Sequence, residues 1–389
     1  MRKQFLPFAK PAVAEDAVAA VSECIRSGWL TTGQRSIEFE EVFKNYTGAK
    51  HALAVNSATA GLHAAFVALN LKPGDEVITT PMTFAATVNT IIFAGGTPVL
   101  ADIDKNTLNI TPENIEKKIT KKTRAICPVH FAGRPCDMAE IEAVAKKHNL
   151  YIIEDAAHAL GAKYQGKKIG LPGGKKTIIF SFHQTKNITT GEGGMLCTDD
   201  EEMAETAAVF RLHGMSKGAW NRYAAKGKAH YDILMPGLKY NMLDIQAVIG
   251  ISQMKQLEQF NARRTELVNK YLSAFKNLDG VILPPPVRKG DVHSWHLFCP
   301  LLDIDRLKIT RDEFMKLMGE RNIGTALHYQ AVHMFSYYQK TYGWKEGDYP
   351  SAEYVAKRIV SLPLFPAMTD ADFNDSVEAV TEILKANKK

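Results

Sequence analysis

An alternation of short apolar runs and amphipathic segments between residues 51 and 198 constrains the fold of this 389-residue chain more than any other feature. The β-branched runs predict buried strands, and the segments between them have the apolar spacing of helices. Strands that alternate with helices in this way predict a mostly parallel sheet covered on both faces. Strands are predicted at 52–55, 76–80, 98–103, 124–129, 151–154, 177–182 and 195–198, and helices at 59–69, 85–93, 112–119, 138–147 and 202–212.

The segments on either side of this alternation predict N-terminal arms and a second, smaller unit. A long helical pattern, bent or broken once, runs from 244 to about 278 and ends before the prolines at 284–286. We expect residues 1–245 to form the arms and the large domain, and residues 246–389 the connecting helix and a small C-terminal domain. The remaining predicted elements are helices at 14–26, 36–46, 311–321 and 370–385, strands at 295–302 and 324–328, and a loop at 216–236.

The composition favours a soluble cytoplasmic protein and argues against several classes of function. The lysines are scattered, without an array of basic and aromatic residues, so nucleic-acid binding is not expected. No stretch is long and apolar enough to span a membrane, and the first residues lack the apolar run of a secretory signal. The 5 cysteines have no C-x-x-C spacing, which indicates reduced thiols and no zinc site. We therefore expect no catalytic metal.

Lys186 is the strongest candidate for a reacting group. It follows the predicted strand 177–182 and precedes a glycine-rich stretch, where the backbone can come close to a ligand. A lysine held out of water at the end of a buried strand has a lowered pKa and becomes nucleophilic. The simpler alternative is a lysine in a solvated turn, so the interpretation depends on partners supplied by the rest of the chain.

Three strand ends supply such partners. A strand enters a helix at Ser57, Ala58 and Thr59, where backbone N–H groups and hydroxyls suit a phosphate. Asp155 ends another apolar strand and Ser181 a third. A phosphate site, a buried carboxylate and an amine nucleophile are the needs of pyridoxal 5′-phosphate (PLP), whose aldehyde bonds to lysine and whose ring nitrogen pairs with an acid. An ordinary helix cap and a buried ion pair are the alternatives.

These motifs resemble those of a known family. Ser-Ala-Thr at 57–59, Glu-Asp-Ala-Ala-His at 154–158 and the lysine segment 181–194 are similar to the DegT/DnrJ/EryC1/StrS sugar aminotransferases. The resemblance runs from about residue 5 to residue 373. It implies a PLP-dependent transferase of the aspartate aminotransferase fold (fold type I), an α/β protein with a large mixed, mostly parallel sheet and a smaller C-terminal α/β domain. Within the family, segments such as 236–241 and 323–328 most resemble UDP-4-amino-4-deoxy-L-arabinose–oxoglutarate aminotransferases.

The resemblance also implies roles for individual residues. Lys186 would bind PLP covalently and Asp155 would pair with its ring nitrogen. A homodimer with shared active sites is implied, in which either Lys239 or Asn241 would reach the phosphate from the partner. Phe84 stands where the arabinose-specific enzymes tend to have tryptophan. The further cofactor contacts implied are the phosphate group Ser57, Ala58, Thr59 and Ser181, the stacking residue Phe84, and His158 near the ring substituents.

Three further residues are candidates for substrate binding. His183 could steer the sugar or its diphosphate, or it could be a packed strand histidine. His328 and Tyr329 could reach the sugar or the carboxylate of the amino donor, with loop packing as the alternative. Arg222 in the predicted loop could contact phosphates.

The reaction implied is the transfer of an amino group from L-glutamate, leaving 2-oxoglutarate, to C4 of a nucleotide-linked 4-keto sugar. UDP-4-keto-pentose, used in lipid A modification, is the first expectation. The alternative acceptor is a UDP- or dTDP-4-keto-6-deoxyhexose. A non-catalytic PLP-binding scaffold is less favoured, because lysine, acid and phosphate site occur together. A PLP-dependent sugar dehydratase is disfavoured, because that branch carries histidine where Lys186 stands.

Overall fold

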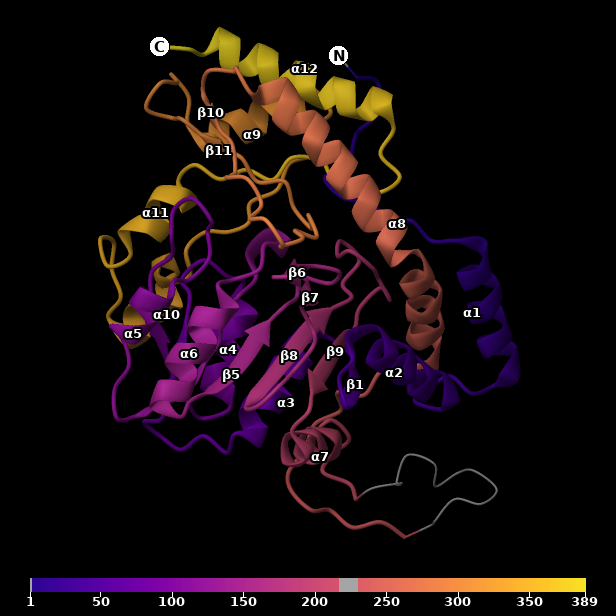
Figure 1. Ribbon diagram of the computed structural model, residues 1–389. Coiled ribbons are helices and arrows are strands. Elements are labelled where there is room, and N and C mark those ends of the chain that lie inside the picture. Colours follow the sequence, from indigo (N-terminus) through magenta and orange to yellow (C-terminus); the bar gives the residue numbers. More distant parts are fainter. Residues whose placement is uncertain (1, 217–229) are drawn as a thin grey trace.

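A seven-stranded mixed sheet forms the centre of the computed structural model, which describes residues 2–216 and 230–389. β9 is antiparallel to both of its neighbours, β1 and β8, and the other neighbouring pairs are parallel, as the mostly parallel prediction required. Arg222, which the sequence analysis named as a possible phosphate contact, lies outside the described residues. In sheet order the strands are β1 (His51–Val55), β9 (Gly194–Thr198), β8 (Lys176–Ser181), β5 (Tyr151–Asp155), β4 (Thr123–Ile126), β2 (Glu76–Thr79) and β3 (Thr97–Leu100). Figure 1 shows the first four of these strands side by side.

Helices cover both faces of this sheet. Successive residues of a strand point to opposite faces, so apolar side chains are available to pack against helices on each side. Ile153 and Ile179 pack with Phe66 of α3, whereas their neighbours Ile152 and Ile178 belong to apolar clusters on the other face. The α/β fold class is therefore confirmed. The helices of the large domain are α3 (Ala58–Ala68), α4 (Ala85–Phe93), α5 (Pro112–Glu116), α6 (Met138–His148) and α7 (Glu201–Phe210), with a short hairpin of β6 (Lys163–Tyr164) and β7 (Lys167–Lys168).

The strand ends needed for a site lie at one edge of the sheet. β5 and β8 are parallel, and β1 runs in the same direction as β8 because both are antiparallel to β9. The carboxyl ends of these three strands therefore meet at the edge where open α/β sheets bind ligands. They carry Ser57, Asp155 and Ser181.

The helix α8 (Asp244–Phe275) connects the sheet to the C-terminal unit. It is one continuous helix of 32 residues, so the predicted bend or break does not appear as an interruption. Figure 1 shows α8 passing from α1 (Glu15–Ser27) and α2 (Gln34–Thr47) towards α12 (Asp370–Ala386), near which both chain ends lie. Our proposed boundary between residues 245 and 246 falls at its start.

Two strands predicted in the C-terminal unit are wrong. The segment 295–302 contributes only β11 (Leu301–Leu302), since Trp295 has a φ of 46° and the N–H of Leu297 binds the carbonyl of Ala132. The segment 324–328 makes one isolated bridge, between Ala326 and Ser361. The other elements of this unit are β10 (Val281–Ile282), α9 (Arg311–Glu320), α10 (Ser336–Tyr342) and α11 (Pro350–Ala356). Within the described residues, no helix meets the length and apolarity needed to cross a membrane.

Candidate active site

Lys186 lies in the loop between β8 and β9 with its amine facing the interior. Its Nζ is 3.5 Å from Nε2 of His296. Burial lowers the pKa of Lys186 to about 8, although the carboxylates of Asp155 and Glu192 act in the opposite direction. The amine is therefore partly neutral, and nucleophilic, near neutral pH.

Hydrogen bonds of Asn187 and Thr189, which follow Lys186 in the chain, anchor the loop. Asn187 is buried, and its amide donates to Oδ1 of Asn261 at 2.7 Å and to the carbonyl of Ser294 at 2.8 Å. The N–H of Thr189 binds Gln253 at 3.3 Å. Asn261 and Gln253 both belong to α8, so this helix fixes the position of the loop.

Asp155 is held by two hydrogen bonds at the end of β5. Its Oδ2 accepts from the hydroxyl of Thr87 at 2.7 Å, and its Oδ1 accepts from the N–H of Ala157 at 3.1 Å. The side chain is buried. A carboxylate fixed in this way can face the ring nitrogen of a bound cofactor without rotating.

Three of the residues predicted to bind a phosphate lie at the start of α3. Ser57 caps the helix by accepting from the N–H of Ala60 at 3.1 Å, while Ala58 and Thr59 stand in the first turn, where N–H groups have no intrahelical partner. Gly194 approaches so closely that a Cβ there would lie 2.7 Å from the nitrogen of Ala58. Because Ser181 pairs with Gly194 in the sheet, its hydroxyl belongs to the same corner.

His158, Tyr329 and Phe84 come together beside this site. Nδ1 of His158 accepts from the N–H of Ala132 at 3.2 Å, so the proton of the neutral ring sits on Nε2, 3.1 Å from the hydroxyl of Tyr329. Burial lowers the pKa of His158 well below its usual range, which keeps the ring neutral. Tyr329 is thereby left free to donate its own O–H. The ring of Phe84, which is 61% exposed, lies 6.1 Å from that of Tyr329.

The other two predicted histidines have different surroundings. His183 is partly exposed, with Nδ1 3.0 Å from the hydroxyl of Thr185 and Nε2 4.0 Å from Glu192. His328 bonds Ser361 at 2.8 Å, and burial, followed by the charge of Lys186, lowers its pKa to about 3. His328 is thus neutral and tied to the C-terminal unit.

Lys239 and Asn241 lie in a segment that runs beside the end of β1. The N–H of Asn56 binds the carbonyl of Tyr240 at 2.8 Å, and Val55 bridges Asn241. Lys239 is exposed. Asn241 is buried and donates to Thr32, while its Oδ1 has no partner among the described residues.

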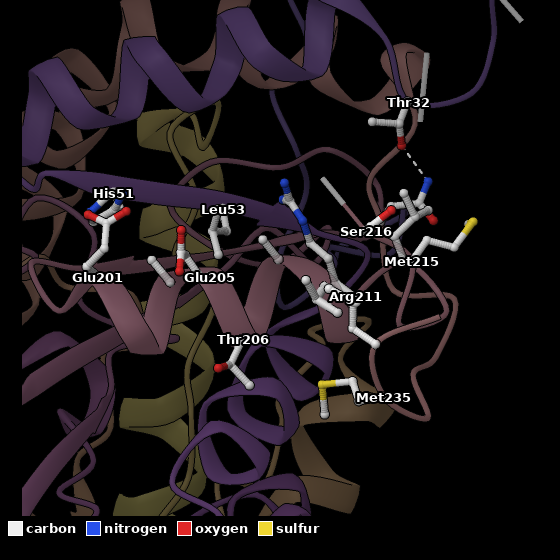
Figure 2. Close-up of a pocket in the computed structure, with 16 residues that line it drawn as sticks. Thr32, His51, Leu53, Glu201, Glu205, Thr206, Arg211, Met215, Ser216 and Met235 are labelled. Atoms are coloured by element: carbon white, nitrogen blue, oxygen red, sulfur yellow. Dashed lines mark hydrogen bonds and ion pairs between the residues drawn. The ribbon is translucent and has the colours of Figure 1, made fainter. Parts of the chain in front are cut away.

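Asn241 also lines a separate surface pocket of about 630 Å³ between β1 and α7. Figure 2 shows Thr32 at one end of this pocket and the pair His51 and Glu201, 2.9 Å apart, at the other. Lys186, Asp155 and Ser181 are not among its described lining residues. The reactive groups therefore lie outside this pocket.

Sequence reasoning missed three residues of the site. Thr87, Asn187 and His296 were not singled out, although each lies in a segment that carries a predicted residue or a family resemblance. The signal for Asn187 is its place next to Lys186. Thr87 and His296 are brought in by contacts between distant segments, which single-sequence patterns do not reveal.

These residues fit PLP in the nature and placement of their groups. A partly neutral amine, a fixed carboxylate and a helix start approached by a glycine match the needs of the cofactor for a nucleophile, an acid and a phosphate site, and they lie at one sheet edge. Within residues 2–216 and 230–389, no three histidine, cysteine or acidic side chains are grouped as metal ligands.

Comparison with known proteins gives the same assignment. The model of the DegT/DnrJ/EryC1/StrS aminotransferase family matches residues 11–381. The spore coat polysaccharide biosynthesis protein SpsC of Bacillus subtilis is 48% identical over 385 residues, covering 99% of this chain and 98% of SpsC. PseC of Helicobacter pylori, an aminotransferase of pseudoaminic acid biosynthesis, superposes with a TM-score of 0.89 at 31% identity, covering 99% and 100% of the two chains. Spr1654 of Streptococcus pneumoniae in its PLP form gives 0.89 at 30% identity, covering 98% and 99%.

Proposed function

The chain belongs to the DegT/DnrJ/EryC1/StrS aminotransferase family, and we propose that it moves the amino group of glutamate to C4 of a nucleotide-linked 4-keto sugar. Its cofactor is PLP, and the activity of the family is sugar amination with glutamate as donor. The observation that carries the proposal is the half-buried amine of Lys186, whose pKa is lowered to about 8 and which feels the charge of the fixed carboxylate Asp155.

Each residue of the site has a distinct part in this proposal. PLP, when bound, supplies an electron sink for the carbon that loses a proton. Lys186 would hold the cofactor covalently between turnovers. Its freed Nζ would take the proton from Cα of glutamate and pass it to the cofactor, and in the second half of the reaction would move a proton from the cofactor to C4 of the sugar. Asp155 keeps the cofactor's ring nitrogen protonated, and Thr87 keeps Asp155 in place. Ser57, Ala58, Thr59 and Ser181 bind the phosphate.

The substrate we propose is UDP-4-keto-pentose, with His183 as a contact to the sugar or its diphosphate. His328 and Tyr329 are proposed to contact the sugar or the carboxylate of glutamate. Tyr329 is the better placed of these two, because His158 leaves its O–H free to donate. The alternative substrate is a UDP- or dTDP-4-keto-6-deoxyhexose. The alternative rests on Phe84, which stands where the arabinose-specific enzymes tend to have tryptophan.

We propose that the working unit is a homodimer in the cytoplasm. Leu234, Leu238 and Leu243 are exposed beside the segment that holds Lys239 and Asn241, and such apolar exposure near a site favours a covering partner. Lys239 or Asn241 would then reach the phosphate of the partner's cofactor. The free state of all five cysteines favours a reducing compartment.

The test is conversion of defined 4-keto sugars in the presence of glutamate and PLP, followed by mass spectrometry of the products. UDP-4-keto-pentose should be aminated faster than the 4-keto-6-deoxyhexoses, and the Lys186→Ala variant should be inactive. Amination that survives Lys186→Ala would refute the role of the lysine. A PLP absorption band that does not respond to glutamate would favour the non-catalytic scaffold.

A further inference from the structure

His296 is a buried histidine that faces the reactive amine and has no role in the function proposed above. It is 2% exposed, its Nε2 is 3.5 Å from Nζ of Lys186, and its Nδ1 has no partner among the described residues. Nε2 therefore has one hydrogen-bond partner, Nζ of Lys186, and Nδ1 has none among the described residues.

The position of His296 is fixed by its surroundings. The guanidinium of Arg264 on α8 donates to the carbonyls of His296 at 3.2 Å and Leu364 at 3.0 Å. The ring of His158 lies beside the ring of His296, with 4.4 Å between the ring centroids. The imidazole is therefore held at Lys186 by contacts on the backbone and on the ring.

Two proton arrangements are consistent with this geometry. If Nε2 accepts from a Lys186 ammonium, the ring proton must sit on Nδ1, where it lacks an acceptor. If Nε2–H donates to a neutral amine, Nδ1 keeps only an unused lone pair. A buried N–H without a partner is rarer than an under-used acceptor, so the second arrangement is favoured.

The charges around the pair favour the same arrangement. His296 faces the cation Arg264 as well as His158, His328 and Lys186, and burial, followed by the charge of Lys186, lowers its pKa well below the usual range. A Lys186 ammonium would add a second cation beside Arg264. Asp155 and Glu192 are the carboxylates whose charge supports the ammonium.

We propose that His296 is a positioning residue that donates its Nε2–H to the free amine of Lys186 and so favours the neutral form of that amine. This inference rests on the role proposed for Lys186. It implies that when the lysine is released from the cofactor, its nitrogen stays in reach, and a larger fraction of it is ready to accept a proton than without His296.

The test measures the pKa of Lys186 in the enzyme after glutamate has converted it to its pyridoxamine phosphate form, which leaves the lysine amine free. Trace acetylation across a range of pH, read by peptide mass spectrometry, gives the titration midpoint of this one lysine. His296→Leu should raise the midpoint by about one pH unit, a tenfold loss of free amine, because a hydrogen bond to the neutral form is removed. His296→Gln, which retains an N–H donor, should stay near the wild type.

The matched control is His293→Leu, which removes another buried histidine of the same segment. Its midpoint should not move. A midpoint that falls or does not change in His296→Leu would overturn the proposal, since a fall means that His296 stabilises the ammonium. If His296→Leu does not fold, His296→Asn, whose shorter amide stops short of Nζ, replaces it with the same expected rise. Failure of glutamate to convert the enzyme would instead count against the proposed function, and labelling of the cofactor-free protein would still report on His296.

Discussion

Raising the pH from 7 to 9 should increase the rate at which the cofactor-free protein captures PLP about tenfold, after which the rate should level off. Only the neutral amine attacks the aldehyde. With a pKa of about 8 for Lys186, the neutral fraction rises from about 9% at pH 7 to about 91% at pH 9. An unperturbed lysine with a pKa near 10.5 would instead rise about a hundredfold over the same range, without a plateau.

The assay is stopped-flow absorbance of the band that forms when PLP binds covalently, recorded at constant ionic strength. Lys186→Arg is the control, because the guanidinium keeps its charge and forms no such bond. Burial keeps His158, His296 and His328 neutral across this range, so they add no titration of their own. A rate that keeps rising with unit slope beyond pH 9 would refute the claim that burial activates this amine.

Three other perturbations follow from the same contacts. Thr87→Val removes the 2.7 Å bond to Asp155 and should weaken PLP binding roughly fivefold, about 1 kcal/mol, measured by fluorescence titration; unchanged affinity would contradict the role of Thr87. Gly194→Ala places a methyl 2.7 Å from the nitrogen of Ala58 and should cost about 1–3 kcal/mol of unfolding free energy and impair PLP binding, whereas Gly173→Ala, with no atom within 4 Å, should do neither. Because Lys186 binds fewer protons in the folded than in the unfolded cofactor-free chain between pH 8 and about 10, the free energy of unfolding should rise there by at most about 1.4 kcal/mol per pH unit, and urea denaturation of Lys186→Met should lack this rise.

The residues that sequence reasoning found are those whose meaning is local. Lys186, Asp155 and Ser57 each stand at the end of an apolar run, and the parallel direction of the strands, which the alternation predicts, is enough to bring them together. Thr87 and His296 depend instead on the packing of a distant helix and loop against those strand ends. A hydrogen bond between residues 87 and 155 leaves no periodic trace in the chain.

The C-terminal unit was less predictable for a related reason. The apolar segment 295–302 has the composition of a strand, but Trp295 adopts a positive φ and the N–H of Leu297 binds the carbonyl of Ala132. Tertiary contacts thus override the local preference for a strand. The long helix was predicted in place, but its continuity through Phe275 was not.

The hydrogen bonds between α8 and the loop that carries Lys186 limit how halves of two such enzymes can be recombined. A crossover between residues 245 and 246 would join a lysine loop from one parent to a helix from the other. Asn187 would then meet a foreign residue in place of Asn261, and Thr189 a foreign residue in place of Gln253. Shuffled chains should work when these partners are inherited together.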